Sequence, residues 1–138
     1  MPRTRHRLTT PQKAALAGEI LVAYVRVRWL LWRNTHLPTV VAALRRTQVQ
    51  RPQAVPPHKA ALLLGRAVTR TLPLLPTDSR CLMRSLVLTS LLARRGLPSR
   101  LVIGVKGGSE FGAHAWVEHD GEPVLPTSRD VYGRLLEV

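Results

Sequence analysis

Two residues of this chain have side chains suited to nucleophilic catalysis, and they are 33 positions apart. Cys81, the only cysteine, follows Asp78 at the start of an apolar run with helical period, which is typical of a helix N-terminus. We expect Cys81 at the second or third helical position, where unpaired N–H groups and the helix dipole favour an anion. Arg80 and Arg84 favour the thiolate in the same way. His114 lies on a later, strand-like segment and is of the type that accepts a thiol proton.

The segments around these two residues predict an α+β fold. Apolar residues recur with helical period over about 9–33, 39–49, 58–72 and 79–95, and the last of these helices should end at Gly96. The period then changes to two, which predicts strands at about 101–105, 111–118 and 122–125. We therefore expect N-terminal helices followed by a cysteine-bearing helix packed on a small antiparallel sheet.

The length of 138 residues suits one domain, which we divide into a helical part, 1–77, and a catalytic core, 78–138. A lone cysteine and the absence of a visible secretory leader predict a cytoplasmic protein. The chain shows no paired cysteines for zinc and no phosphate-binding glycine loop, so we expect neither a metal nor a cofactor.

A third group that orients His114 can be sought from the predicted hairpin. Asp120 and Gly121 form the strongest short hairpin signal in the chain, and counting back from that turn pairs His114 with Thr127. An orienting acid should lie near Thr127, and the first acid that follows is Asp130. We rank Asp130 first as the third catalytic residue.

Other assignments of this third role stay open. The hydroxyl or backbone of Thr127 could hold the imidazole, or Cys81 and the histidine could act as a dyad. Asp120 is needed for the turn, and Glu118 is more simply an exposed strand residue. Taken separately, each catalytic candidate also has a non-catalytic interpretation. The cysteine could be a buried small residue, and the histidine could have a structural role. Their joint context, with Trp116 beside the histidine, favours catalysis.

The charge is unevenly distributed along the chain. Residues 1–109 hold nineteen Lys and Arg against two acids, whereas residues 110–138 hold two Arg against six acids. The basic part favours an acidic or phosphate-bearing neighbour. Aromatic residues are too few to interleave a basic patch as single-strand binders do, so no nucleic acid is expected.

The first helix is apolar over more than half of its circumference. Charged residues interrupt it, namely Glu19, Arg26 and Arg28, so we expect neither a membrane span nor membrane contact. Two interpretations remain open, a helix packed into the core and a helix that docks on a partner protein. The aromatic residues available for docking are Tyr24, Trp29 and Trp32.

Three stretches of the sequence resemble a known family. They are Cys81-Leu-Met-Arg-Ser-Leu, Gly96-Leu-Pro-Ser-Arg-Leu-Val-Ile-Gly-Val and Phe111-Gly-Ala-His-Ala-Trp-Val-Glu-His-Asp-Gly-Glu-Pro-Val. The chain is similar here to the transglutaminase-like leader peptidase of lasso peptide biosynthesis. It resembles most the split form, in which the protease is separate from a small leader-recognition protein.

This resemblance implies a bacterial, cytoplasmic cysteine protease that removes the leader from a ribosomally made precursor peptide. The implied partners are the precursor, a separate leader-recognition protein and an ATP-dependent, asparagine-synthetase-like cyclase that receives the core peptide. The family's nucleophile and base map onto Cys81 and His114, whereas its acid position falls on Pro126.

Two other functions are compatible with the same residues. A transglutaminase-like transferase would use the Cys81–His114 site but pass the acyl group to an amine instead of water. A non-enzymatic adaptor would bind peptide or nucleic acid through its basic surface and leave Cys81 inert.

Overall fold

The computed structural model describes residues 9–33, 36–46, 56–75, 80–106, 112–124 and 133–138. The helices come first and are α1 (Thr10–Arg33), α2 (Leu37–Arg45), α3 (Pro57–Thr71), the short 3-10 helix η1 (Leu72–Leu74) and α4 (Arg80–Arg94). The strands follow and are β1 (Arg100–Lys106), β2 (Gly112–His119), β3 (Glu122–Pro123) and β4 (Gly133–Glu137). The strands form one antiparallel sheet in the order β3-β2-β1-β4, so the α+β prediction is confirmed.

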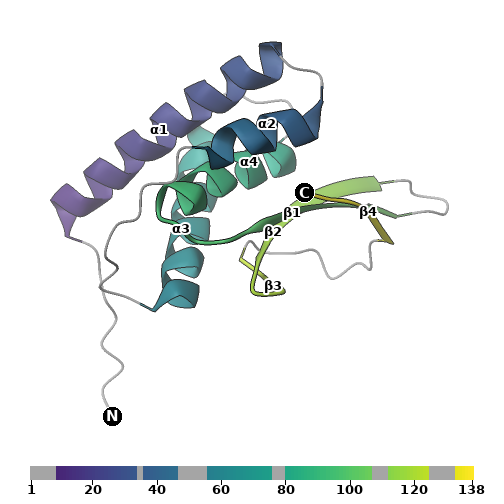
Figure 1. The fold of residues 1–138 in the computed structure, drawn as a ribbon. Coiled ribbons are helices and arrows are strands. Elements are labelled where there is room, and N and C mark those ends of the chain that lie inside the picture. Colours follow the sequence, from purple (N-terminus) through teal and green to yellow (C-terminus); the bar gives the residue numbers. More distant parts are fainter. Residues whose placement is uncertain (1–8, 34–35, 47–55, 76–79, 107–111, 125–132) are drawn as a thin grey trace.

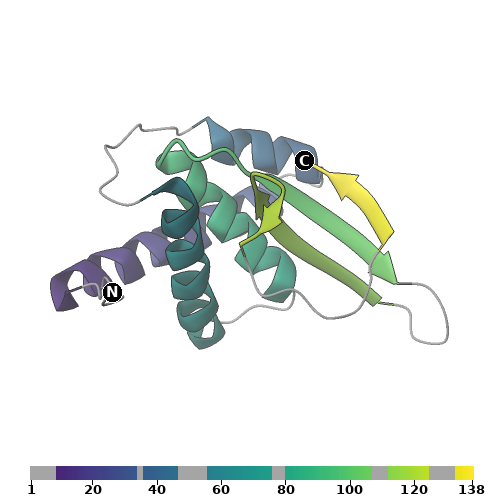
Figure 2. The same ribbon diagram turned by 90° about the horizontal axis from the view of Figure 1, so that it is seen from below.

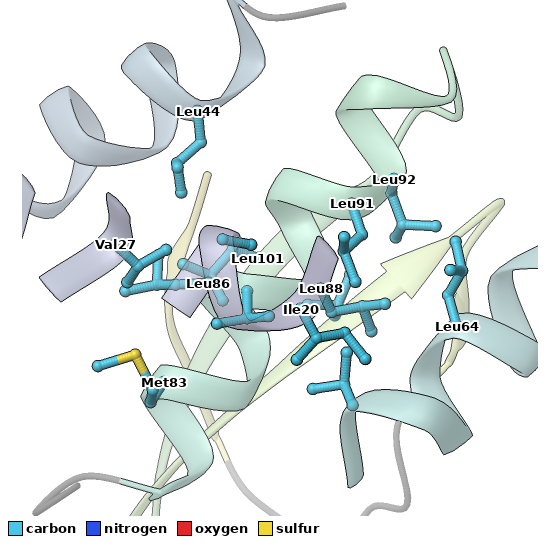
Figure 3. Packing of buried hydrophobic residues seen from close by; sticks show 14 of the residues in the cluster. Ile20, Val27, Leu44, Leu64, Met83, Leu86, Leu88, Leu91, Leu92 and Leu101 are labelled. Atoms are coloured by element: carbon cyan, nitrogen blue, oxygen red, sulfur yellow. The ribbon is translucent and has the colours of Figure 1, made fainter. Parts of the chain in front are cut away.

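Helix α4 lies at the centre of the fold, in contact with α1, α2, α3 and β2 (Figures 1 and 2). Its side chains meet those of the neighbouring helices in one hydrophobic core (Figure 3). The fully buried leucines of α4 are Leu86, Leu88, Leu91 and Leu92. Such close burial leaves α4 little freedom to slide or rotate, because interiors are packed to the density of organic crystals.

Three small polar residues of α4 are buried, Ser85, Thr89 and Ser90, and the first two form hydrogen bonds within the helix. Ser85 Oγ donates to the carbonyl of Cys81 at 2.8 Å, and Thr89 Oγ1 donates to the carbonyl of Ser85 at 2.8 Å. Bonding to a carbonyl one turn earlier satisfies a buried hydroxyl without any partner outside the helix. The hydroxyls therefore allow neighbouring elements to approach α4 closely, as their small size predicts.

Helix α4 ends where the sequence predicts. Gly96 has a φ of 68°, a left-handed conformation that glycine adopts without strain. The N–H of Leu97 donates to the carbonyl of Leu92 at 2.9 Å, which closes the helix end. The chain then turns directly into β1.

The start of the second helix differs from the prediction because proline is tolerated in a first turn. Helix α2 begins at Leu37 instead of residue 39, with Pro38 inside its first turn. Helix α3 ends at Thr71, within one residue of the predicted end, and the short helix η1 that follows includes Pro73. The predicted end of the second helix, at residue 49, lies outside the described residues.

The predicted hairpin turn is present between β2 and β3. Asp120 and Gly121 have φ values of 51° and 79°, which two-residue hairpin turns of type I′ require. His119 pairs with Glu122, as counted from the sequence. Strand β3 ends at residue 123 instead of residue 125, and its last residue is a proline, which has no N–H to extend the ladder.

Strand β4 was not predicted. It pairs with the open edge of β1, with a register shift between Ile103 and Gly104. Beyond the strand, Val138 and Leu101 exchange two backbone hydrogen bonds, of 2.7 and 2.8 Å. Arg45 of α2 also donates to the Val138 carbonyl at 2.8 Å. These contacts hold the end of the chain against the sheet, although the five-residue strand has little apolar alternation of its own.

The long helix α1 packs on α4 through one face. Its buried residues are Ile20, Ala23, Tyr24, Val27 and Leu30. Glu19 accepts two hydrogen bonds from Arg95, both of 2.9 Å, at the end of α4. No helix in the described part of the chain is both long and apolar enough to cross a membrane.

Candidate active site

Cys81 is the second residue of α4, as the sequence predicts. Its side chain is half-buried and packs against the hydrophobic core. N–H groups in the first turn of a helix have no carbonyl partner within that helix, so the start of α4 favours negative charge. Residues 76–79, which include Asp78, lie outside the described residues.

His114 lies on β2, the strand that packs on α4. Its partner across the sheet is Gly104 of β1, which has no side chain to crowd the imidazole. Strand β3 pairs only with residues 118 and 119, at the far end of β2. Among the described strands, β2 is therefore the outer one beside His114.

Two causes hold the pKa of His114 below its ordinary value. The larger is burial, which disfavours the charged imidazolium, and the second is the positive charge of Arg84. Arg84 is three residues after Cys81 on α4, so the first turns of that helix act electrostatically on His114. A lowered pKa means that His114 is neutral at neutral pH and takes up a proton only as the pH falls through that pKa. The neutral imidazole is the form that accepts a thiol proton.

His114 shares one face of β2 with Trp116 and Glu118, because side chains alternate along a strand. The His114 and Trp116 rings are stacked, with centroids 6.0 Å apart and planes inclined by 23°. Trp116 Nε1 donates to Glu118 Oε1 at 3.0 Å. Glu118 is only 7% exposed, so our expectation of an exposed strand residue was wrong.

The opposite face of β2 points toward the helices. Ala115 and Val117 belong to the hydrophobic core, and His119 is 2% exposed. The His119 ring stacks on that of His58 from α3, with centroids 6.1 Å apart. Its Nδ1 lies 2.7 Å from the carbonyl of Pro98, which requires a proton on Nδ1. His119 is thus a structural histidine on the other side of the strand from His114.

The alternatives for the third catalytic residue can be placed only in part. Asp120 lies in the hairpin turn, with Oδ2 3.4 Å from Nε2 of His119. Six residues of strand separate it from His114, a distance of about 20 Å, so Asp120 does not orient His114.

The register predicted for the hairpin is present as far as Val124, whose N–H donates to the carbonyl of Val117 at 2.9 Å. Thr127 and Asp130 lie outside the described residues.

A depression of about 270 Å³ lies at the hairpin end of the sheet. Its lining includes Pro98, Arg100, Glu118 and Asp120, whereas His114 is toward the opposite end of β2. We therefore assign no chemistry to it. Among the described residues, no three His, Cys, Asp or Glu side chains gather in a group that could hold a metal ion.

The comparison with protein families decides the superfamily. The family model of the transglutaminase-like superfamily matches residues 21–137, which include both the helices and the strands. The chain belongs to this superfamily. No curated protein sequence and no solved structure matches the chain significantly.

The transglutaminase-like superfamily includes cysteine peptidases and transferases, so this domain indicates a cysteine-based enzyme. The only cysteine is Cys81, which makes it the one available nucleophile of that kind. The hydrogen bond between Trp116 and Glu118 was not predicted from the sequence. The residue pattern of a short strand does not show which of its polar residues will be buried.

Replacing Arg84 tests the electrostatic link between α4 and His114. We expect Arg84→Gln to raise the pKa of His114, because a nearby positive charge is lost, while burial keeps it below the ordinary value. An NMR titration of the histidine ring protons, assigned with His114→Gln, measures this shift. Arg70→Gln, on an exposed position of α3, is the matched control. An unchanged His114 titration in Arg84→Gln would show that Arg84 does not act on the imidazole.

Proposed function

We propose that this chain is a cysteine peptidase that removes the leader from a ribosomally made lasso precursor peptide in the bacterial cytoplasm. The observation that carries the proposal is the pairing of two elements. Helix α4 begins with the only cysteine, packs on the strand that bears His114, and supplies the charge that favours a neutral imidazole. Membership of a superfamily with cysteine peptidases and the resemblance of three sequence stretches support the same conclusion.

The proposed reaction has two halves. His114 takes the proton of the Cys81 thiol, and the thiolate attacks the carbonyl carbon of the scissile peptide bond. The resulting tetrahedral intermediate collapses when His114 gives its proton to the leaving amine. A water molecule, deprotonated by His114, then attacks the acyl-enzyme, and the proton returns to Cys81 as the leader carboxylate leaves. No cofactor takes part in either half.

Backbone N–H groups at the start of α4, including that of Cys81, would stabilise the oxyanion. We keep Asp130 as the proposed orienter of His114. Gly133, three residues later, pairs with Val105, next to the Gly104–His114 pair, so the described chain re-enters the sheet near His114. This position supports Asp130 over Asp120, which is bound to the far end of β2.

Replacing Cys81 tests the peptidase directly. We expect Cys81→Ala to lower the rate of leader removal by about 10³-fold or more, because no other residue supplies a thiolate. The assay incubates the chain with precursor peptide and leader-recognition protein and identifies fragments by mass. Melting temperature should change little, since the substitution removes one half-buried sulfur atom.

His114→Gln should lose cleavage similarly, whereas His36→Gln, at an exposed position, should retain it. Cleavage that is retained in Cys81→Ala would contradict a mechanism in which the Cys81 thiol is the nucleophile. A product joined to an added amine, instead of a free carboxylate, would favour the transferase. An uncut precursor, together with salt-sensitive binding of nucleic acid by the wild-type chain, would favour the adaptor.

We further propose that the outer face of α1 binds the separate leader-recognition protein. This face is apolar and is opposite to the side packed on α4. Trp32 is 84% and Val25 58% exposed. The remaining exposed large apolar residues of the face are Leu21, Val22 and Trp29. Contiguous exposed apolar surface on a helix is typical of a protein interface.

The charges around this face indicate the chemistry of its partner. Arg33 lies over the Trp29 ring, 4.9 Å from its centroid, and Arg28 donates to the Tyr24 hydroxyl at 2.9 Å. Glu19, the only acid in the described helices, is paired with Arg95 on the inner side. The outer face is thus apolar with a basic margin, which fits a partner with an apolar surface and an acidic rim.

A double substitution tests this interface. We expect Val25→Ser with Trp32→Ser to weaken binding of the leader-recognition protein by about tenfold or more, because apolar contacts at the centre of an interface carry most of its affinity. Titration calorimetry measures the affinity, and Cys81 alkylation checks that the site is intact. Leu74→Ser, at a residue 82% exposed outside α1, is the matched control. Equal affinities for all three proteins, or binding of α1 only to anionic vesicles, would overturn the assignment.

A further inference from the structure

Three side chains form a continuous line along the outer face of β2. The His114 ring stacks on Trp116, and the Trp116 indole donates to the carboxylate of Glu118. The line runs from the proposed base at one end to a buried acid at the other. Glu118 is too far along the strand to contact His114 directly, since four residues of strand span about 13 Å. Trp116 lies between the two residues and contacts both.

The Trp116 ring is held at its polar end. It is 8% exposed, and its one donor, Nε1–H, is satisfied by Glu118 at 3.0 Å. A buried indole N–H needs a partner, so rotation of the ring away from Glu118 would leave that donor unsatisfied. The hydrogen bond thus fixes the plane of the indole, and with it the surface against which the imidazole lies.

Glu118 is held in turn from the other edge of the sheet. Arg134 of β4 donates to both carboxylate oxygens, at 2.8 Å to Oε1 and 3.3 Å to Oε2. Arg134 also donates to Glu137 on its own strand. These two charge-assisted hydrogen bonds compensate the buried carboxyl group for lost hydration. Gly104 of β1 pairs with His114 of β2 on one side and with Arg134 of β4 on the other, and it has no side chain to separate them.

We propose that Trp116 and Glu118 are positioning residues for His114, with Glu118 fixing the indole and the indole fixing the orientation of the imidazole. This inference rests on the proposed function of Cys81 and His114. Neither residue touches the reacting atoms. Their role is to restrict rotation of the base, which the neighbouring glycine of β1 does not do.

A purely structural role for these residues predicts a different result. The Glu118–Arg134 ion pair joins β2 to β4 across β1, and losing it would lower stability whatever Trp116 does. The positive charge that lowers the pKa of His114 is that of Arg84 on α4, and the other charged groups on this side of the sheet are Glu118 on β2 and Arg134 on β4. A variant that breaks the contact between Trp116 and Glu118 but keeps these charges separates an effect on the orientation of His114 from an effect on its electrostatics.

Four variants make this separation. Trp116→Phe keeps an aromatic face and all charges but removes the donor to Glu118. Glu118→Leu removes the acceptor, and Glu118→Gln restores an oxygen acceptor without the charge. Val68→Ala, at a fully buried core position of α3 outside these contacts, is the control for stability alone.

We expect kcat for leader removal to fall about tenfold to a hundredfold in Trp116→Phe and Glu118→Leu, because small misplacements of a catalytic group cost this much. KM should stay within about twofold, since substrate contacts are unchanged. Glu118→Gln should recover most of the lost kcat. Val68→Ala should lower the melting temperature and leave kcat close to wild type.

A second measurement does not depend on any substrate. In an NMR titration we expect Trp116→Ala to raise the pKa of His114 toward its ordinary value, because the imidazole loses part of its cover. His114 is a base in its neutral form, so the acid limb of the cleavage profile should move to higher pH with it. His36 serves as the internal reference in the same spectra, because it lies exposed on α2.

The outcomes are distinct. A His114 titration in Trp116→Ala identical to wild type, or a kcat that follows melting temperature across all four variants, would overturn the positioning role. If the titration shifts as expected but the wild-type chain cleaves no precursor, positioning of His114 stands and the peptidase assignment fails.

Discussion

The burial of α4 between the other helices and β2 determines where the nucleophile lies. Its leucines fill the centre of the core, and its buried hydroxyls bond within the helix, so no loose contact remains through which α4 could shift. Cys81 stands at the second position of this fixed helix, beside the strand that carries His114. The position of Cys81 relative to β2 thus follows from packing that stabilises the whole domain.

The electrostatics of the site follow from the same arrangement. The helical part is strongly basic, and Arg84 contributes to the lowered pKa of His114. Burial and this positive charge favour a neutral imidazole on the strand, which is the form that accepts a proton at neutral pH. The acidic residues gather instead on the strands, where Glu118 holds Trp116 and Arg134.

Much of the fold could be predicted from local patterns. Helical period, Gly96 at the end of α4 and the Asp120–Gly121 turn each carry a strong local signal, and each is present as expected. Strand β4 escaped prediction because its residues are held by pairing with β1 and by Arg45 of α2, which are contacts between distant parts of the chain. The helix starts at Leu37 and Pro57 were shifted because proline fits a first turn.

The positions of the candidate residues Cys81 and His114 in the fold were predictable, whereas the contacts around them were not. A lone cysteine at a helix start and a histidine on a strand are visible in the sequence, whereas the burial of Glu118 depends on Arg134, sixteen residues later. The exposed outer face of α1 could not be separated from its core face by composition, because the helix is apolar nearly all round. Only the packing of Tyr24 inward and Trp32 outward distinguishes the two faces.

The most direct test of the central claim is the rate at which Cys81 reacts with iodoacetamide across a range of pH, followed by intact mass. Since Cys81 is the only cysteine, the mass change reports this site alone. The account predicts that His114→Gln slows alkylation near neutral pH and changes the shape of the profile, while His36→Gln leaves the wild-type profile unchanged. Identical profiles for wild type and His114→Gln would contradict a cysteine and histidine that act together.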